Sequence, residues 1–227
     1  TETQVLKSVD NILVCSNWAK GIIDKNIKVP CSVVPLGVDS EIFYYRDNKP
    51  SSGPLRFINI GKWEKRKGHD LLPEIILEQC DEFELWMMPD NPFLSKEEDT
   101  KWKTMYRDKL GDRVKFIPRM DSQNEVADII SQCDLGVFPA RAEGWNLDLT
   151  EVMAVTGNYP YHSLYSGHME IYNRVLESDP EYQYDLEQAY DNIWFFGQGN
   201  WASLNIHDER HLLSLAIEGL TFNDGNR

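Results

Sequence analysis

The sequence predicts an α/β fold in which a parallel sheet is covered by helices on both faces. Two observations support this fold class. Short apolar runs recur between residues 11 and 138 without the strict polar alternation of a half-exposed sheet, which is typical of strands buried on both faces. Stretches with apolar residues at helical spacing separate these runs, and strands that alternate with helices form parallel sheets.

The expected strands and helices alternate along most of the chain. Strands are expected at residues 11–16, 32–35, 55–61, 83–88, 114–118, 135–138, 159–164 and 192–196. Helices are expected at residues 17–25, 68–80, 96–110, 122–132, 147–155 and 208–220. Ser16 supports the first helix, because its hydroxyl can accept a hydrogen bond from the helix start. Residues 46–54 contain Pro, Gly and Ser and predict a loop, whereas residues 174–191 show no clear pattern.

The composition argues against several classes of partner. With 23 Lys and Arg against 37 Asp and Glu, the net charge of -14 disfavours nucleic acid and anionic membrane surfaces. No apolar run approaches the roughly 20 residues that span a bilayer, and residues 1–10 lack the features of a secretory signal. The four cysteines form no C-x-x-C pair, so we expect free thiols in a cytoplasmic protein.

Two carboxylates, Glu143 and Glu151, lie where the expected strand at 135–138 leads into the expected helix at 147–155. The first lies on the loop before the helix, and the second about two turns inside it. Backbone N–H groups at the start of a helix lack partners and attract an anion, which the two carboxylates would flank. Because its helix is apolar nearly all round, Glu151 needs a hydrogen-bond partner. A structural donor and the hydroxyl groups of a bound ribose are equally suitable partners.

A second loop of interest, Gly61 to Gly68, also joins a strand to a helix and carries four cationic residues. A run of charges is ordinarily a solvated surface. At the end of a strand and between glycines, however, this run favours a diphosphate site, with Lys62 and Lys67 at its two ends. The loop lacks the Walker pattern, and the sequence contains no G-x-S-x-G or G-x-G-x-x-G motif that would suggest a hydrolase or a dehydrogenase.

Four blocks of sequence, in this order, resemble one known family. They are residues 33–39 with Phe43, 61–68, 139–154 and 166–170. Together they resemble the C-terminal, donor-binding half of a GT-B glycosyltransferase of the retaining family-four type. The resemblance implies a Rossmann-like parallel sheet with helices on both faces. It also implies a hexosyltransferase that uses a nucleotide-diphosphate sugar and retains the anomeric configuration.

The resemblance also implies roles for individual residues. Glu143 is expected to contact the transferred sugar as the catalytic carboxylate, and Glu151 is expected to bind the ribose. Lys62 and Lys67 are expected to bind the diphosphate. The implied donor site is completed by Gly37 in the first block, Met120 in the loop near the base, and the backbone N–H groups of Gly144, Trp145, Asn146 and Leu147.

The resemblance further implies two regions of unequal size. Residues 1–30 resemble the end of a preceding acceptor-binding domain or its linker, and residues 31–227 correspond to the donor-binding domain. Residues 155–160 depart from the family pattern by one extra residue, and residues 171–200 follow it poorly. We therefore expect a fragment or a naturally short protein that lacks most of the acceptor domain. Such a chain would bind a nucleotide sugar but transfer it poorly.

The expected partners are a GDP- or UDP-linked sugar and an acceptor that the sequence does not identify. We expect neither a metal nor a further cofactor, because His207 and His211 have zinc-compatible spacing but no third ligand. Two alternatives remain open. One is a non-catalytic nucleotide-sugar binding module. The other is a GT-B nucleotide-sugar epimerase, which the basic loop and the two carboxylates fit less well.

Overall fold

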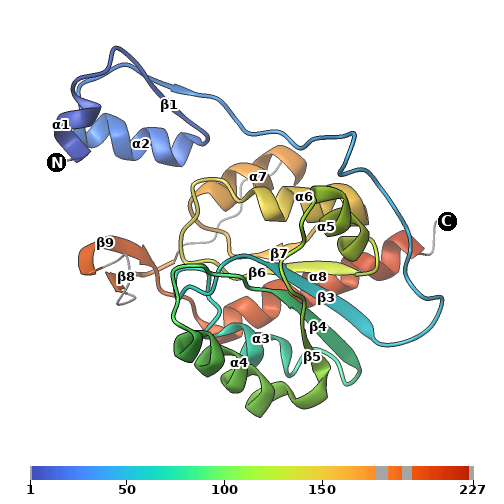
Figure 1. Cartoon of the computed structure of the whole chain (residues 1–227). Coiled ribbons are helices and arrows are strands. Elements are labelled where there is room, and N and C mark those ends of the chain that lie inside the picture. The colour runs from blue at the N-terminus through green and yellow to red at the C-terminus, as the bar shows by residue number, and fades with distance from the viewer. Residues whose placement is uncertain (1, 177–183, 191–195, 225–227) are drawn as a thin grey trace.

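A five-stranded parallel sheet forms the centre of the protein (Figure 1). The computed structural model describes residues 2–176, 184–190 and 196–224. From one edge to the other, the strands are β5 (Val114–Phe116), β4 (Phe83–Met88), β3 (Leu55–Ile60), β6 (Leu135–Phe138) and β7 (Tyr161–His162). After β3, the chain adds β4 and β5 on one side of this strand. It then returns to the centre and adds β6 and β7 on the other side. Open parallel sheets bind ligands at such a switch point, here between β3 and β6.

Helices cover both faces of the sheet, as the sequence predicts. Neighbouring residues of β3 point to opposite faces: Phe57 packs in one apolar cluster and Ile58 in the other. On the Phe57 face lie α3 (Leu72–Ile76), α4 (Lys96–Leu110) and α8 (Ile206–Asp224). On the Ile58 face lie α5 (Gln123–Ile130), α6 (Leu147–Thr156) and α7 (Gly167–Leu176). The predicted fold class is therefore confirmed.

Local sequence explains where α4 and α5 begin. Ser95 and Ser122 each accept a hydrogen bond from the backbone N–H three residues later, at 3.2 and 3.3 Å. The carboxylates of Glu98 and Glu125, at those later positions, accept the serine N–H groups in return. These reciprocal bonds are capping boxes, which satisfy donors that a helix start leaves free. Because each helix follows a strand, both starts lie at the carboxyl edge of the sheet.

Residues 2–33 form a small layer of their own next to α7. The short helix α1 (Glu2–Leu6) leads into β1 (Ile12–Val14), which is followed by α2 (Asn17–Asn26) and by β2 (Cys31–Val33). The two strands pair in parallel with each other and not with the five-stranded sheet. The Asn17 side chain donates to the Glu170 carboxylate at 2.7 and 3.0 Å, which docks α2 against α7. An extended segment then runs from β2 to β3 (Figure 1).

Several elements differ from the sequence prediction. The helix expected at 68–80 is confined to α3, because Gly68 has a φ of +73° and the chain turns before Pro73 opens the helix. The sequence pattern does not predict α7, nor the antiparallel strands β8 (Leu186–Tyr190) and β9 (Phe196–Ala202). Of the strand expected at 192–196, all but its last residue lies outside the described residues.

The β8–β9 hairpin is attached to the rest of the protein through the buried Arg141. The guanidinium donates to Asp70 at 2.7 and 3.0 Å and to Glu187 of β8 at 3.1 Å. It also donates to the carbonyl of Lys65 in the loop at 61–68. The N–H of Ala202 in β9 donates to the Arg141 carbonyl at 3.0 Å. Because a buried guanidinium needs acceptors for its donors, Arg141 holds the hairpin beside the basic loop.

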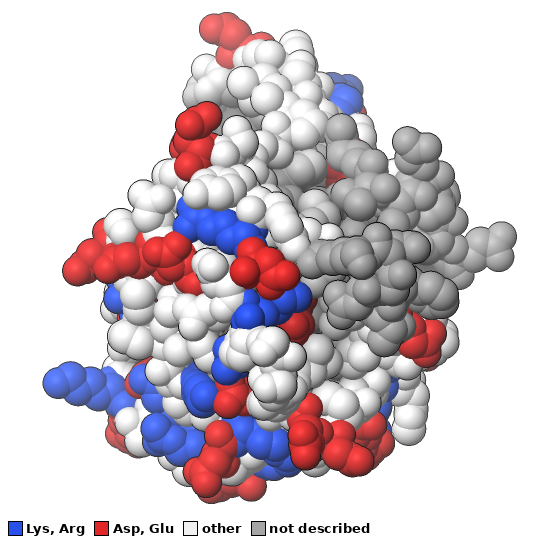
Figure 2. Space-filling model, turned by 90° about the vertical axis from the view of Figure 1, so that its right-hand side faces the viewer, with Lys and Arg blue, Asp and Glu red and all other residues white. Residues whose placement is uncertain are grey.

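Charges of both signs are spread over the surface. On the face shown in Figure 2, cationic and anionic side chains lie next to one another instead of separating into patches of one sign. Ion pairs such as that of Lys115 with Glu84 are typical of this arrangement. Within the part of the chain that the structure describes, no helix has both the length and the hydropathy needed to cross a bilayer.

We predict that Gly68→Ala lowers the free energy of unfolding by about 3 kcal/mol. A methyl group there would lie 1.8 Å from the backbone carbonyl oxygen of Pro139, and the positive φ adds strain. Urea unfolding measures the change. The control is Gly21→Ala in α2, which has nothing within 4 Å and should be neutral or slightly stabilising. Equal effects of the two substitutions would contradict the prediction.

Candidate functional site

A cavity of about 460 Å³ opens at the carboxyl ends of the central strands. Its walls come from the ends of β3 and β4, the start of α5 and the first turns of α6. Phe43, from the extended segment, contributes one side. Other lining residues are Lys62, Lys67, Met120, Asp148 and Glu151. The cavity therefore lies where open parallel sheets bind their ligands.

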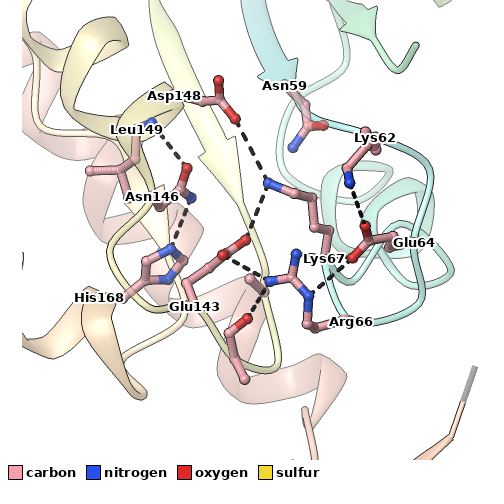
Figure 3. Close-up of polar contacts among 12 residues, drawn as sticks. Asn59, Lys62, Glu64, Arg66, Lys67, Glu143, Asn146, Asp148, Leu149 and His168 are labelled. Atoms are coloured by element: carbon pink, nitrogen blue, oxygen red, sulfur yellow. Dashed lines mark hydrogen bonds and ion pairs between the residues drawn. The ribbon is translucent and has the colours of Figure 1, made fainter. Parts of the chain in front are cut away.

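Lys67 reaches this cavity because Gly61 leaves room for it. Gly61 has a φ of +144°, and a methyl group there would lie 2.8 Å from the Lys67 Nζ. The Lys67 ammonium lies 3.2 Å from Glu143 Oε1 and 3.7 Å from Asp148 Oδ2 (Figure 3). Lys62, at the other end of the loop, is more exposed. Both lysines that the sequence assigns to a diphosphate thus line the cavity.

Arg66 is a site residue that the sequence pattern does not single out. Its Nη1 lies 2.8 Å from the Glu143 carboxylate and donates to the Ala142 carbonyl at 2.6 Å. Its Nε and Nη2 contact Glu64 at 3.0 and 2.9 Å. The side chain therefore joins the loop after β3 to the loop after β6 (Figure 3). The signal in the sequence is weak, because Arg66 is one of four neighbouring cations and Glu143 lies far along the chain.

Glu143 is ionised, with only 11% of its side chain exposed. Burial acts to raise the pKa of its carboxyl, but the charges of Lys67 and Arg66 outweigh burial and lower this pKa to about 2. Its backbone is held as well: the N–H donates to Ser166 Oγ at 2.7 Å, and the carbonyl accepts from the Gly167 N–H at 2.8 Å. A permanently ionised carboxylate suits hydrogen bonds from hydroxyl groups and does not suit donation of a proton.

Asn146 shapes the start of α6, with a φ of +88° that is uncommon for residues other than glycine. Its Oδ1 accepts from the Leu149 N–H at 3.3 Å, and its Nδ2 lies 2.9 Å from His168 Nε2. Burial and the neighbouring His162 lower the pKa of His168 to about 3, so the imidazole is neutral and accepts this hydrogen bond. His168 therefore orients the amide that caps the helix, a role that the sequence analysis does not assign to it.

Within the described part of the chain, two backbone N–H groups at the start of α6 have no hydrogen-bond partner. The first N–H groups of a helix have no acceptor inside it. Asn146 occupies the N–H of Leu149, which leaves those of Leu147 and Asp148. Because Lys67 lies beside Asp148, the helix start and an ammonium present positive charge to the same part of the cavity.

Besides Glu143 and Asn146, four further residues that the sequence assigns to the site are not part of the cavity wall. The Trp145 side chain is buried in the apolar cluster beneath α6, and Leu147 is 43% exposed. Gly144 packs so closely on Gly167 that a methyl group on the latter would lie 2.4 Å from the Gly144 oxygen. Gly37 lies in the extended segment, with nothing within 4 Å of a methyl group placed on it. The contribution of these residues to a ligand is restricted to their backbone groups.

Glu151 faces the cavity from α6 and is half-buried. Burial, and to a smaller extent the charge of Asp148 one turn earlier, raise its pKa to about 7. Of the two partners that the sequence allows for this carboxylate, a structural donor is absent among the residues that the structure describes. The carboxylate is therefore available to the hydroxyl groups of a ligand in the cavity.

Comparison with known proteins relates the chain to glycosyltransferases. Residues 54–156 match the family described as glycosyl transferases group 1. YqgM of Bacillus subtilis, an uncharacterized glycosyltransferase, is 29% identical over 157 residues, which is 67% of this chain and 42% of YqgM. Sucrose-phosphate synthase from Thermosynechococcus elongatus matches with a TM-score of 0.63 and 23% identity, over 73% of this chain and 43% of the synthase. Anabaena HepE in complex with UDP-glucose matches with a TM-score of 0.60 and 17% identity, over 74% of this chain and 49% of HepE.

The parallel sheet with helices on both faces is the Rossmann-like arrangement of GT-B proteins. The region that matches group 1 glycosyl transferases, residues 54–156, is a little under half of the chain, and the relationship to YqgM extends over 157 residues. The family resemblance predicted from the four sequence blocks is thus confirmed, as is the Rossmann-like sheet. The matches span less than half the length of each of these relatives. The basic loop, Glu143 and Glu151 all lie within residues 54–156.

We predict that Glu151→Gln makes the stability of the ligand-free protein less dependent on pH. Because folding raises the pKa of Glu151 from 4.5 to about 7, the folded state favours the protonated carboxyl, and stability falls as pH rises between these values. Glutamine is neutral and avoids this penalty. In urea unfolding at pH 8, the variant should be about 1 kcal/mol more stable, a figure reduced for the half-exposed position, with little difference at pH 5.

The matched control for this prediction is Glu82→Gln, at an exposed position at the amino end of β4. It should change the stability by a similar amount at both pH values. A gain for Glu151→Gln at pH 5 that equals the gain at pH 8 would contradict the prediction.

Proposed function

We propose that this chain binds a nucleotide-diphosphate sugar and forms the donor half of a retaining hexosyltransferase. The observation that carries the proposal is the Glu151 carboxylate, which shares one cavity with the Lys67 ammonium and has no partner in the described structure. The paired hydroxyls of a ribose suit the carboxylate. A diphosphate suits Lys67 together with the N–H groups of Leu147 and Asp148. A nucleoside diphosphate offers both groups in one molecule.

In this proposal Glu143 positions the transferred sugar. Its pKa of about 2 keeps the carboxylate ionised, so it accepts hydrogen bonds from sugar hydroxyls. Transfer breaks the bond between the anomeric carbon and the terminal phosphate, and negative charge grows on the departing diphosphate. Lys62, Lys67 and the start of α6 stabilise that charge. Retention of configuration rests on the resemblance of the four sequence blocks.

The proposal includes no metal ion or further cofactor. Two ammonium groups and a helix start supply the positive charge that a divalent cation supplies at many diphosphate sites. In the described parts of the chain, no group of three or more His, Cys, Asp or Glu side chains is arranged to hold a metal ion. The diphosphate therefore has cationic partners that belong to the chain itself.

Three apolar side chains of the cavity wall can contact a nucleobase. Phe43, Met120 and Val126 line the cavity and offer a surface for a nucleobase ring. Because HepE is described in complex with UDP-glucose, we propose UDP-glucose as the first donor to test and GDP-mannose as the second. Because the matches cover less than half of each relative, we also propose that acceptor binding and efficient transfer need a further domain. The free thiols of the four cysteines support a cytoplasmic location.

We predict that Lys67→Ala weakens donor binding by about tenfold to a hundredfold, because a charge-assisted contact with the diphosphate is lost. The matched control is Lys65→Ala, which removes a cation from the same loop. Lys65 lies over the Trp201 ring and outside the cavity, so its loss should have little effect. Isothermal titration calorimetry with UDP-glucose and then GDP-mannose measures both variants.

Equal losses in the two variants would contradict a specific role for Lys67. The proposed function as a whole is wrong if the wild-type chain binds neither donor, nor the corresponding nucleoside diphosphate, at millimolar concentration.

A further inference from the structure

Asp148 places a carboxylate inside the proposed diphosphate site. It is the second residue of α6, it lines the cavity, and it lies 3.7 Å from the Lys67 ammonium. Glu151 follows one turn later on the same helix face, also in the cavity wall. An acidic residue at a helix start ordinarily stabilises the helix. Here the start of α6 and Lys67 are proposed to bind the diphosphate. The negative charge of Asp148 therefore repels that ligand.

The Asp148 carboxylate is not needed to hold the Lys67 side chain in place. The Lys67 ammonium is closer to Glu143, at 3.2 Å, than to Asp148. Glu143 is fixed in turn by Arg66 at 2.8 Å (Figure 3). The Lys67 side chain also packs against Gly61, which confines it. Lys67 therefore stays directed at the cavity when the Asp148 charge is removed.

Donor and product differ in charge at the phosphate next to the sugar. In the donor, this phosphate is esterified to the sugar and carries one negative charge. In transfer, the bond between the anomeric carbon and the phosphate oxygen breaks, and its electron pair stays on that oxygen. The acceptor oxygen bonds to the anomeric carbon, and the acceptor proton ends in solvent. The product therefore has a terminal phosphate with close to two negative charges at pH 7.5.

On the basis of the proposed function, we propose that Asp148 is a specificity-determining residue that disfavours the free nucleoside diphosphate relative to the sugar-bearing donor. A fixed carboxylate repels a phosphate in proportion to the charge on that phosphate, and the repulsion is strong in a partly buried site. Asp148 thus weakens product binding more than donor binding. Because changes in affinity within one site act mainly on the dissociation rate, the product leaves faster after each transfer.

Calorimetric titration of the 227-residue chain at pH 7.5 tests this role. UDP is compared with UDP-glucose, and GDP with GDP-mannose, in the wild type and in Asp148→Asn, which keeps the shape of the side chain. We expect the substitution to tighten binding of the nucleoside diphosphate by about tenfold and of the donor by less than about threefold. If this variant fails to fold, Asp148→Ser gives the same comparison, since serine also favours a helix start.

The matched control is Asp121→Asn. Asp121 lines the same cavity and follows Met120, which the proposal assigns to the base, so both ligands should change affinity by the same factor. An unchanged ratio of the two affinities in Asp148→Asn, or weaker binding of both ligands, would overturn the role of Asp148. Absence of nucleotide binding by the wild type would instead overturn the proposed function.

Discussion

The contact of Glu143 with Arg66 and Lys67 is the interaction on which the rest of the site depends. It joins the loop after β3 to the loop after β6, at 2.8 and 3.2 Å, and so fixes both loops at the switch point of the sheet. Charges with little exposure are stable only when they are paired. The same contact directs one ammonium to the cavity and keeps the carboxylate ionised. One small network therefore determines both the shape and the electrostatics of the site.

Much of the fold and part of the site could be predicted from the sequence, because they depend on local patterns. Buried strands, a basic loop between glycines, and the spacing of Glu143 and Glu151 leave signals within a few residues. Arg66 and His168 could not be recognised in this way. Their partners, Glu143 and Asn146, are distant in sequence, and only the fold brings each pair together.

The failures of the secondary-structure prediction also have tertiary causes. The helix expected from residue 68 begins at Leu72, because Gly68 lets the backbone pass close to the Pro139 carbonyl. The β8–β9 hairpin is held by a few buried side chains, among them Trp201, and by polar contacts: Glu187 accepts from Arg141 and, at 2.8 Å, from the Trp201 indole N–H. A hairpin held in this way does not need an alternating apolar face, so periodicity in the sequence does not reveal it.

Arg141 links the hairpin to the basic loop through one guanidinium group. Most of the hairpin lies in residues 171–200, where the chain follows the family pattern poorly, yet it is attached to a guanidinium that also holds the basic loop. Arg141 has two acidic partners, Asp70 and Glu187. A segment without a carboxylate at the position of Glu187 would leave Arg141 with Asp70 as its acidic partner. The charge of Glu187 is therefore the feature of this segment on which the full pairing of Arg141, and with it the support of the basic loop, depends.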